Sequence, residues 1–237
     1  MNPTIARITA RGLVGRRRFL LLLPLPLVLL VLATLMRSFD SALEPAVTTV
    51  LIAFGIAVVV PFTALVIGTG VLGPEIDDGT LLHILAKPLP RREIILTKFA
   101  VACGLCLPVC VVSLFAAGWI IDSVRLGAGF AVGAAVAAMA YCTLFGALSL
   151  LIRRPVLLGL AYILVWEGLL GNLVTGTGVL SIQQYAVTIA GWVSGSGVVD
   201  GRVSLPVSLI MAGVFTIGAT LLAIDRLRSF SIAGSTG

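Results

Sequence analysis

Four cysteines and a single histidine are the first candidates for chemistry in this chain of 237 residues. Cys103, Cys106 and Cys110 are three and four residues apart, a spacing that places them on one face of a helix. Cys142 lies further along the chain, and His83 lies far from all of them in sequence. A structural zinc site needs about four convergent ligands, whereas a free cysteine behaves as a small hydrophobic residue. We therefore interpret the cysteines as residues that pack between helices.

The second candidate is Glu167, the only charged residue in the apolar run 155–174. At 1.5 Å per residue it would lie roughly 16 Å inside a membrane helix, where an acidic group costs about 2.5–3.5 kcal/mol. Such a group usually faces a protein interior or a wet cavity. Two interpretations stay open: a hydrogen bond to a Ser or Thr of a neighbouring span, or a place in the substrate path. The adjacent Trp166 could line the same cavity or face lipid.

The third candidate is the polar and apolar stretch 73–93. Pro74 suits the first turn of a helix, and three acidic residues within the next four positions favour the positive helix end. The apolar run 81–86 would continue this helix, and Pro88 would end it. The pattern predicts a short helix on the cytoplasmic face, too short to cross a membrane. Its apolar residues need a cover, either lipid headgroups or a partner protein.

The rest of the chain indicates what positions these residues. Hydrophobic residues make up 59% of the sequence, charged residues only 11%, and the mean hydropathy is +1.16, whereas soluble domains carry about a quarter charged residues. Long uncharged runs are sufficient to cross a bilayer as helices, since lipid offers backbone groups no partner. We predict an all-α polytopic membrane protein, a single domain over residues 1–237 with six spans. The predicted spans are 19–36, 46–72, 99–121, 126–151, 156–174 and 204–224.

The basic residues predict the orientation. With the N-terminus in the cytoplasm, thirteen of the sixteen Lys and Arg residues fall inside, and only Arg37, Arg125 and Arg202 fall outside. This strong bias follows the positive-inside rule and places both termini in the cytoplasm. Because the basic residues lie at membrane edges, anionic lipid rather than nucleic acid is their expected partner.

Two segments outside the spans have helical patterns. Residues 1–18 predict a cytoplasmic interfacial helix, with a disordered basic leader as the alternative. Residues 175–203 form an outer segment for which we predict a short helix resting on, or dipping into, the outer leaflet. The apolar residues that recur there at helical spacing are Ile182, Ala186, Ile189 and Val193.

Small residues in the fourth span predict a close helix contact. Gly129, Gly133 and Ala137 recur every four residues, which lets another helix approach closely. The sequence leaves open whether that helix belongs to the same chain or to a second one.

The stretch between the second and third spans resembles the signature of type-2 permease subunits of ATP-binding cassette transporters. That signature is Glu-x-x-x-Gly-Thr-Leu, followed by Pro-x-x-Arg and a Lys-Phe pair that enters the next helix. The residues that carry it here are Glu75, Gly79, Thr80, Leu81, Pro88, Arg91, Lys98 and Phe99. The resemblance extends to length, span number, interfacial helix and outer segment, although this chain lacks the large extracellular domain often seen in the family.

The resemblance implies a coupling helix in residues 73–93 that docks into a separate ATPase subunit. It also implies a pair of permease subunits, homodimeric or heterodimeric, with two ATPase copies in a bacterial cell membrane, and usually export. The chain itself would bind no cofactor, because ATP and Mg²⁺ belong to the partner. No Gly-x-x-x-x-Gly-Lys-Ser/Thr motif occurs in this sequence. The residues implied to contact the ATPase are Glu75, Asp78, Gly79, Thr80, Leu81, Leu82, Leu85, Pro88 and Arg91.

Two other function classes fit the sequence less well. Secondary transporters often have internal repeats and several intramembrane charges, and neither is evident here. An intramembrane enzyme would need further aspartates after Asp77 and Asp78, or a Ser/His pair, and the third span has no aspartate before Asp122. We therefore favour a permease, with a secondary transporter or channel as the alternative and an enzyme as the weakest candidate.

Overall fold

The computed structural model describes Thr9 and residues 22–39, 42–77, 91–152, 154–170, 177–195, 197, 199 and 201–229. Within these ranges the chain is helical and has no strand, which confirms the predicted all-α class. The helices are α2 (Pro24–Ser38), α3 (Leu43–Ala46), η2 (Val47–Val59), α4 (Val60–Asp77), α6 (Arg91–Ile121), α7 (Val124–Leu151), α8 (Pro155–Ala161), η3 (Tyr162–Leu170), η4 (Thr177–Leu180), α10 (Ile182–Ser194) and α11 (Leu205–Ser229).

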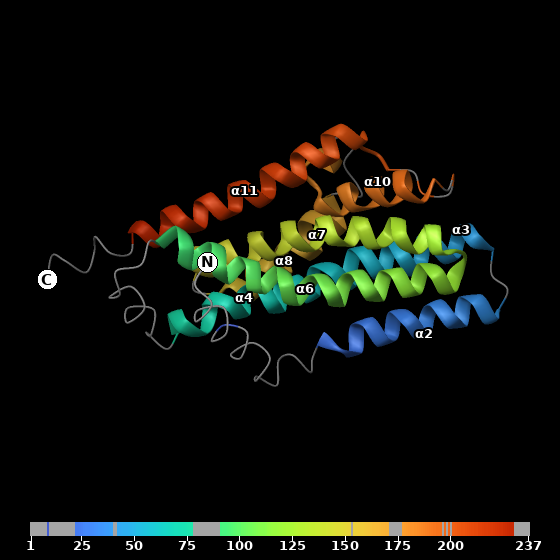
Figure 1. Ribbon diagram of the computed structural model, residues 1–237, viewed down its shortest axis with the longest axis horizontal. Helices are drawn as coiled ribbons and strands as arrows, with labels where there is room; N and C mark the ends of the chain where they lie inside the picture. The colour runs from blue at the N-terminus through green and yellow to red at the C-terminus, as the bar shows by residue number, and fades with distance from the viewer. Residues whose placement is uncertain are drawn as a thin grey trace, which may run out of the picture.

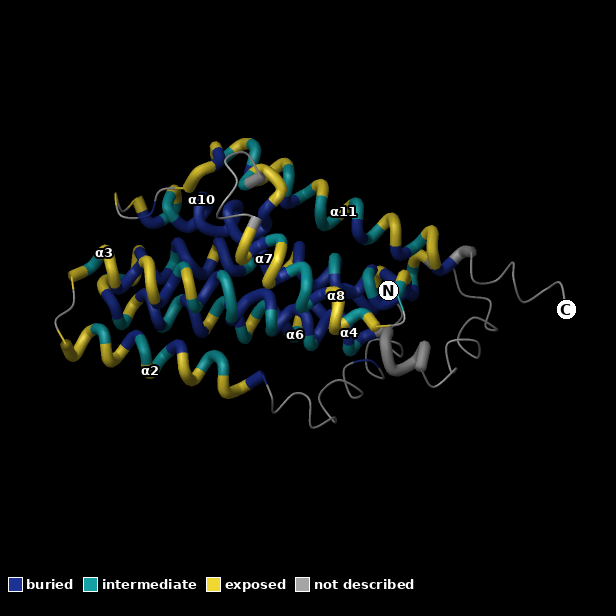
Figure 2. Tube along the Cα trace, turned by 180° about the vertical axis from the view of Figure 1, so that it is seen from behind, coloured by how far each residue is buried: buried dark blue, intermediate teal, exposed yellow. Residues whose placement is uncertain are grey.

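Helix α7 is the centre of the bundle. It contacts α4, α6, α10 and α11, and most of its residues are buried. Figure 1 shows the long helices following one axis, with α2 along one side of the bundle and α11 along the opposite side. Exposed hydrophobic residues lie along α2, α11 and the helix formed by α8 and η3 (Figure 2), as expected for surfaces that face lipid.

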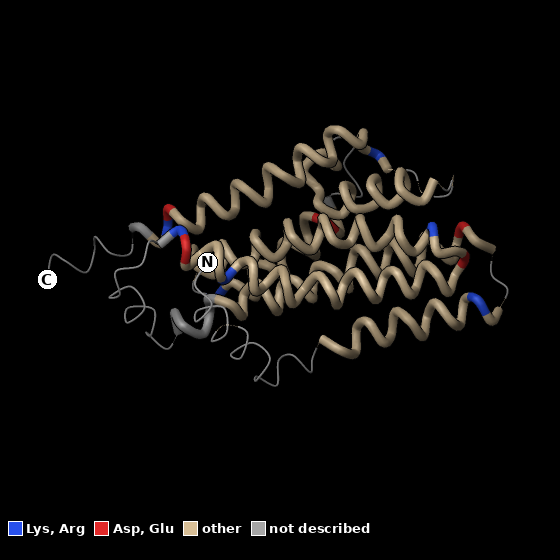
Figure 3. Tube along the Cα trace, in the orientation of Figure 1, with Lys and Arg blue, Asp and Glu red and all other residues tan. Residues whose placement is uncertain are grey.

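Four helical segments are long and apolar enough to cross a membrane: Leu43–Val71, Arg92–Ile121, Val124–Leu151 and Leu205–Leu227. They coincide with predicted spans two, three, four and six. The apolar helices Pro24–Ser38 and Pro155–Leu169 coincide with predicted spans one and five but are shorter within the described residues. Charged residues gather at the two ends of the bundle's long axis (Figure 3). The chain is thus a multi-pass membrane protein, and the count of six spans stays a prediction.

The flanks of the predicted coupling helix belong to the neighbouring long helices. Helix α4 continues through Pro74 to Asp77, and α6 already begins at Arg91, eight residues before the predicted start of the third span. The prediction that Pro74 starts a new helix is therefore wrong. A proline deletes one backbone N–H, and apolar membrane helices tolerate that loss because nearby groups satisfy the freed carbonyl. Residues 78–90, like 1–18 apart from Thr9, lie outside the described residues.

Two helices contain wide, π-helical turns. Helix α3 runs into η2, which narrows to α4, and helix α8 widens to η3. Such turns are rare and often occur at functional sites. The second of them, η3, contains Glu167.

Candidate functional site

Glu167 is buried, with 3% of its surface exposed, at the junction of η3 and α10. Its Oε1 atom accepts hydrogen bonds from the Tyr162 hydroxyl at 3.1 Å and from the Ile182 backbone N–H at 2.9 Å. Its Oε2 atom accepts a hydrogen bond from the Ser181 hydroxyl at 2.5 Å. A carboxylate offers about four acceptor positions, so these three donors occupy most of them.

The contact to Ile182 explains why a carboxylate suits this place. The first N–H groups of a helix have no partner within the helix, and the helix dipole makes that end positive. Ser181 already caps α10, because its side chain accepts a hydrogen bond from Gln184 N at 3.3 Å. Glu167 supplies a second cap from a different helix, and it thereby ties η3 to the start of α10.

Two further hydrogen bonds hold the turn that precedes α10. The indole Nε1 of Trp166 donates to the Leu180 carbonyl oxygen at 3.2 Å, and the Tyr185 hydroxyl donates to the Val179 carbonyl oxygen. Trp166 is partly exposed. The two neighbouring residues 166 and 167 therefore both connect η3 to the segment 180–182.

A tyrosine of α7 completes the surroundings of Glu167. Tyr141 is fully buried. Its hydroxyl interacts electrostatically with Glu167 and Tyr162 and lies within hydrogen-bonding reach of Glu167 and of the Gln183 backbone. The Tyr141 ring stacks on Phe145 at 5.8 Å, and Phe145 meets Tyr162 edge-on at 6.3 Å between ring centroids. We call Glu167, Tyr141, Tyr162 and Ser181 the Glu167 cluster.

Sequence reasoning found Glu167 but not its partners. The sequence predicts a Ser or Thr of a neighbouring span as the partner, and the structure instead places Ser181 just before α10. Tyr162 precedes Glu167 by five residues, a spacing that brings side chains together on a π-helical turn rather than on an α-helix. A π-helical turn leaves no clear mark in the sequence, so this pairing could not be foreseen.

Of the predicted coupling region, residues 73–93, the structure describes only the two ends, 73–77 and 91–93, and both belong to neighbouring helices. Glu75 belongs to the last turn of α4 and Arg91 is the first residue of α6. The remaining residues implied to contact an ATPase fall outside the described residues: Asp78, Gly79, Thr80, Leu81, Leu82, Leu85 and Pro88.

Lys98 and Phe99, the last two residues of the motif, connect α6 to α4 and α7. Lys98 is buried, and its Nζ atom donates to the Val71 carbonyl oxygen of α4 at 3.5 Å. Phe99 lies against Gly146 of α7 so closely that a Cβ at Gly146 would be 2.5 Å from the ring. The start of α6 is therefore bound to both α4 and α7.

The small residues of the fourth span contact a helix of the same chain. A Cβ added at Gly133 would lie 2.4 Å from the Ala186 carbonyl oxygen, and one at Gly129 would lie 2.6 Å from that of Ala190. Both partners belong to α10. This settles the question that the sequence left open for Gly129 and Gly133.

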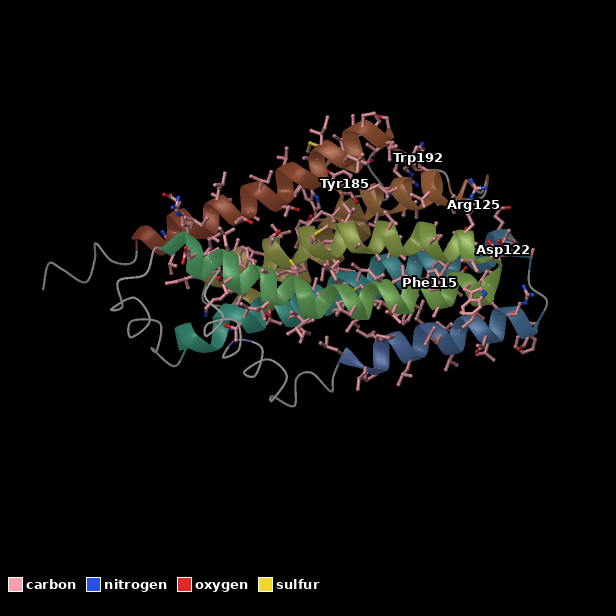
Figure 4. The ribbon with its side chains drawn as sticks, viewed as in Figure 1. Phe115, Asp122, Arg125, Tyr185 and Trp192 are labelled. Atoms are coloured by element: carbon pink, nitrogen blue, oxygen red, sulfur yellow. The ribbon has the colours of Figure 1, made fainter. Side chains whose placement is uncertain are left out.

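Helix α10, the helix predicted in the segment 175–203, thus packs on α7 with Ile182, Ala186 and Ile189 buried. Its last turn ends at Gly195, which has a left-handed φ of 60° and lies under the guanidinium group of Arg125. Figure 4 shows Arg125 and Asp122 at the far end of the bundle, beyond Trp192. A cation near the C-terminal end of α10 is favourable, because that helix end is negative.

The four cysteines lie between α6 and α7. Cys106, Cys110 and Cys142 are buried, and the sulfur atoms of Cys106 and Cys110 are 3.8 Å apart. Within the described ranges, no group of three or more His, Cys, Asp or Glu side chains is arranged to hold a metal ion. Their burial agrees with the interpretation as packing residues.

Comparison with known proteins gives one match. Residues 16–184 match the family described as ABC-2 family transporter protein, a range that includes the first five predicted spans, the coupling region and the start of α10. No curated protein matches the chain. Because the match covers well over half of the sequence, this chain belongs to the ABC-2 transporter family and is a membrane permease component of an ATP-binding cassette transporter.

Proposed function

We propose that this permease serves an exporter in which residues 73–93 transmit the ATP-driven closure of a separate ATPase to the membrane helices. The family implies an ATPase partner. In the proposed assembly, two ATPase copies bind ATP and Mg²⁺ and two permease subunits form the path, in a bacterial cell membrane with both termini in the cytoplasm. In this assembly the chain itself transmits the movement of the ATPase to the membrane helices.

The observation that carries this proposal is a hydrogen bond between the two helices that flank the coupling region. Residues 78–90 connect the end of α4 to the start of α6, and the hydrogen bond from Lys98 to Val71 joins these two helices nearby. A force applied to the connecting segment would therefore act on both helices together. Helix α6 in turn approaches α7 closely, since a Cβ at Gly118 would lie 2.7 Å from the Gly127 Cα atom.

The test is a bulky substitution in the coupling region. Glycine inside a helix is unfavourable by about 1 kcal/mol relative to alanine, and close approach of a partner backbone is a physical reason to keep it. Gly79→Trp should therefore weaken co-purification of the ATPase, or lower transport-linked ATP hydrolysis, while the protein still inserts into membranes.

Gly197→Trp is the matched control, because Gly197 lies on the predicted outer side and a Cβ there would meet nothing within 4 Å. This control should assemble and hydrolyse ATP like the unmodified protein. Full coupling in Gly79→Trp would contradict the proposal.

A further inference from the structure

We propose that the end of α11, residues 225–229, forms a second contact with the ATPase subunit, beside the coupling region in space and far from it in sequence. This inference rests on the proposed function and deepens it, because it adds to the ATPase contact a helix that residues 73–93 do not include. It also gives the ATPase a second route into the bundle, through α11 to α10.

The first argument is the position of this helix end. Helices α6 and α11 contact each other, and Figure 1 shows the end of α11 beside the start of α6. The first residues of α6, 91–93, belong to the predicted coupling region. On α11, Ala223 and Leu227 are buried, as expected for the side of a helix that faces the bundle. A protein bound to residues 73–93 would therefore lie directly beside residues 225–229.

The second argument is the length of α11. The uncharged run predicted as span 204–224 measures roughly 31 Å at 1.5 Å per residue, which is already sufficient to cross the hydrocarbon core. The helix nevertheless continues to Ser229. The two residues that follow the uncharged run, Asp225 and Arg226, are exposed. The last turn of α11 therefore lies beyond the apolar layer, on the side where the ATPase would bind.

The third argument is charge. The two neighbouring helix ends carry six charged residues: Arg91, Arg92, Glu93, Asp225, Arg226 and Arg228. Four positive and two negative charges leave a surplus of two positive charges, which favours a partner surface with a net negative charge.

Both signs of charge occur at this end of the bundle (Figure 3), and this separates the two candidate partners. Anionic lipid headgroups attract arginines but repel carboxylates. A protein surface can instead offer an acidic group to each arginine and a basic group to Glu93 and Asp225. We therefore assign this surface to the ATPase rather than to lipid.

A contact at this position would act on α10 without passing through α6. Helix α11 packs on α7 and on α10, and the ring centroids of Tyr185 on α10 and Phe215 on α11 are 6.2 Å apart. The opposite side of α11 is exposed, as at Ile210 and Val214. Since α11 is held along one side only, a displacement of its end can tilt it against α7 and α10.

The test is site-specific photocross-linking in membranes from cells that produce the full chain together with its ATP-binding cassette subunit. The photoreactive amino acid p-benzoylphenylalanine replaces Asp225 or, in a second variant, Arg226. Cross-linked products are identified by mass spectrometry, and the ATPase is recognised by a peptide with the motif Gly-x-x-x-x-Gly-Lys-Ser/Thr. Both positions should cross-link to the ATPase.

Two further probe positions serve as references. Val214 is exposed and lies on the same face of α11 as Asp225, three turns earlier and roughly 16 Å deeper in the apolar layer. A probe at Val214 should give lipid adducts and no ATPase adduct. A probe at Leu82, in the predicted coupling helix, tests the proposed function itself.

Lipid adducts alone from Asp225 and Arg226, or no adducts from either, would overturn this inference. An ATPase adduct from Val214 would overturn it as well, because that position lies within the bilayer. If Leu82 still cross-links to the ATPase in these cases, the proposed function stands and only the contact at α11 fails. Adducts from Asp225 without any from Leu82 would support the contact at α11 and contradict the docking of residues 73–93.

Discussion

The contact between α7 and α10 leads to a sharp stability prediction at Gly133. A Cβ at this position would lie 2.4 Å from the Ala186 carbonyl oxygen and 3.4 Å from the Ala190 Cβ. The obstacle at Ala186 is backbone, so it cannot rotate away as a side chain would. In the variant Gly133→Ala, α10 must move outward from α7 by several tenths of an ångström, and its buried contacts loosen along the helix.

A matched glycine separates this steric effect from helix propensity. Gly104 lies inside α6 and a Cβ there would meet nothing within 4 Å. In both variants, Gly104→Ala and Gly133→Ala, alanine favours the helix by about 1 kcal/mol, so that contribution cancels in the comparison. Overpacking costs about 1–3 kcal/mol, and Gly133→Ala should be less stable than Gly104→Ala by that amount.

The cysteines of the protein can serve as probes for the thermal unfolding midpoint. Its four cysteines carry free thiols, three of them buried between α6 and α7, so a thiol-reactive dye reports unfolding as they become accessible. For a domain of this size, a difference of 1–3 kcal/mol corresponds to a midpoint lowered by about 2–12 °C relative to Gly104→Ala. Equal midpoints for the two variants would refute the close backbone contact between α7 and α10.

Three more predictions follow from the same structure. Glu167→Leu leaves three donors without their acceptor and should lower stability by at least about 1–3 kcal/mol in the same dye assay, whereas the glutamine variant should lose less. Gly195→Ala forces alanine to a φ of 60° beneath an arginine and should destabilise α10 by about 1–2 kcal/mol, measured as faster hydrogen exchange in this helix. Single cysteines at Asp40 and Asp200 in a cysteine-free background should react with an impermeant maleimide on intact cells, and one at Arg153 should not; outside labelling of all three would contradict the six-span topology.

The helical segments were predictable because the bilayer leaves few alternatives. The uncharged run predicted as span 126–151 appears as α7, Val124–Leu151, with an error of two residues at one end. Ser123 explains that difference, since its hydroxyl accepts a hydrogen bond from Leu126 N and caps the helix. Hydrophobic length identifies a span, whereas the capping side chain determines where the helix begins.

The helix ends that flank residues 78–90 were harder to predict. The acidic residues after Pro74 favour the start of a helix, yet α4 simply continues to Asp77. Local preferences for a helix start are worth only about 1 kcal/mol, and the long helix that arrives from the membrane outweighs them. For the same reason α6 begins at Arg91, before its apolar span.

The Glu167 cluster shows why the candidate site could be found only in part. An acidic residue in an apolar run is visible in the sequence, because its cost in the membrane demands a compensating contact. Its partners Tyr141 and Ser181 come from α7 and from the turn before α10, and only the tertiary structure brings them together. Sequence pattern therefore identifies the residue that needs a partner, and packing decides which partner it receives.

The two kinds of helix contact in this protein suggest where the bundle rearranges. Helix α7 meets α6 at Gly127 and α10 at Gly133 through backbone contacts that allow little sliding, so these three helices should move as one body. The helix formed by α8 and η3 is attached in two ways. Its α8 part packs on α4 and α7, whereas its η3 part is held by the hydrogen bonds from Trp166 to Leu180 and from Ile182 to Glu167, which can break and reform at small cost if other donors and acceptors replace them. In the proposed mechanism, a displacement that passes through α6 would thus be taken up at the junction between η3 and the α6–α7–α10 body, where the Glu167 cluster lies.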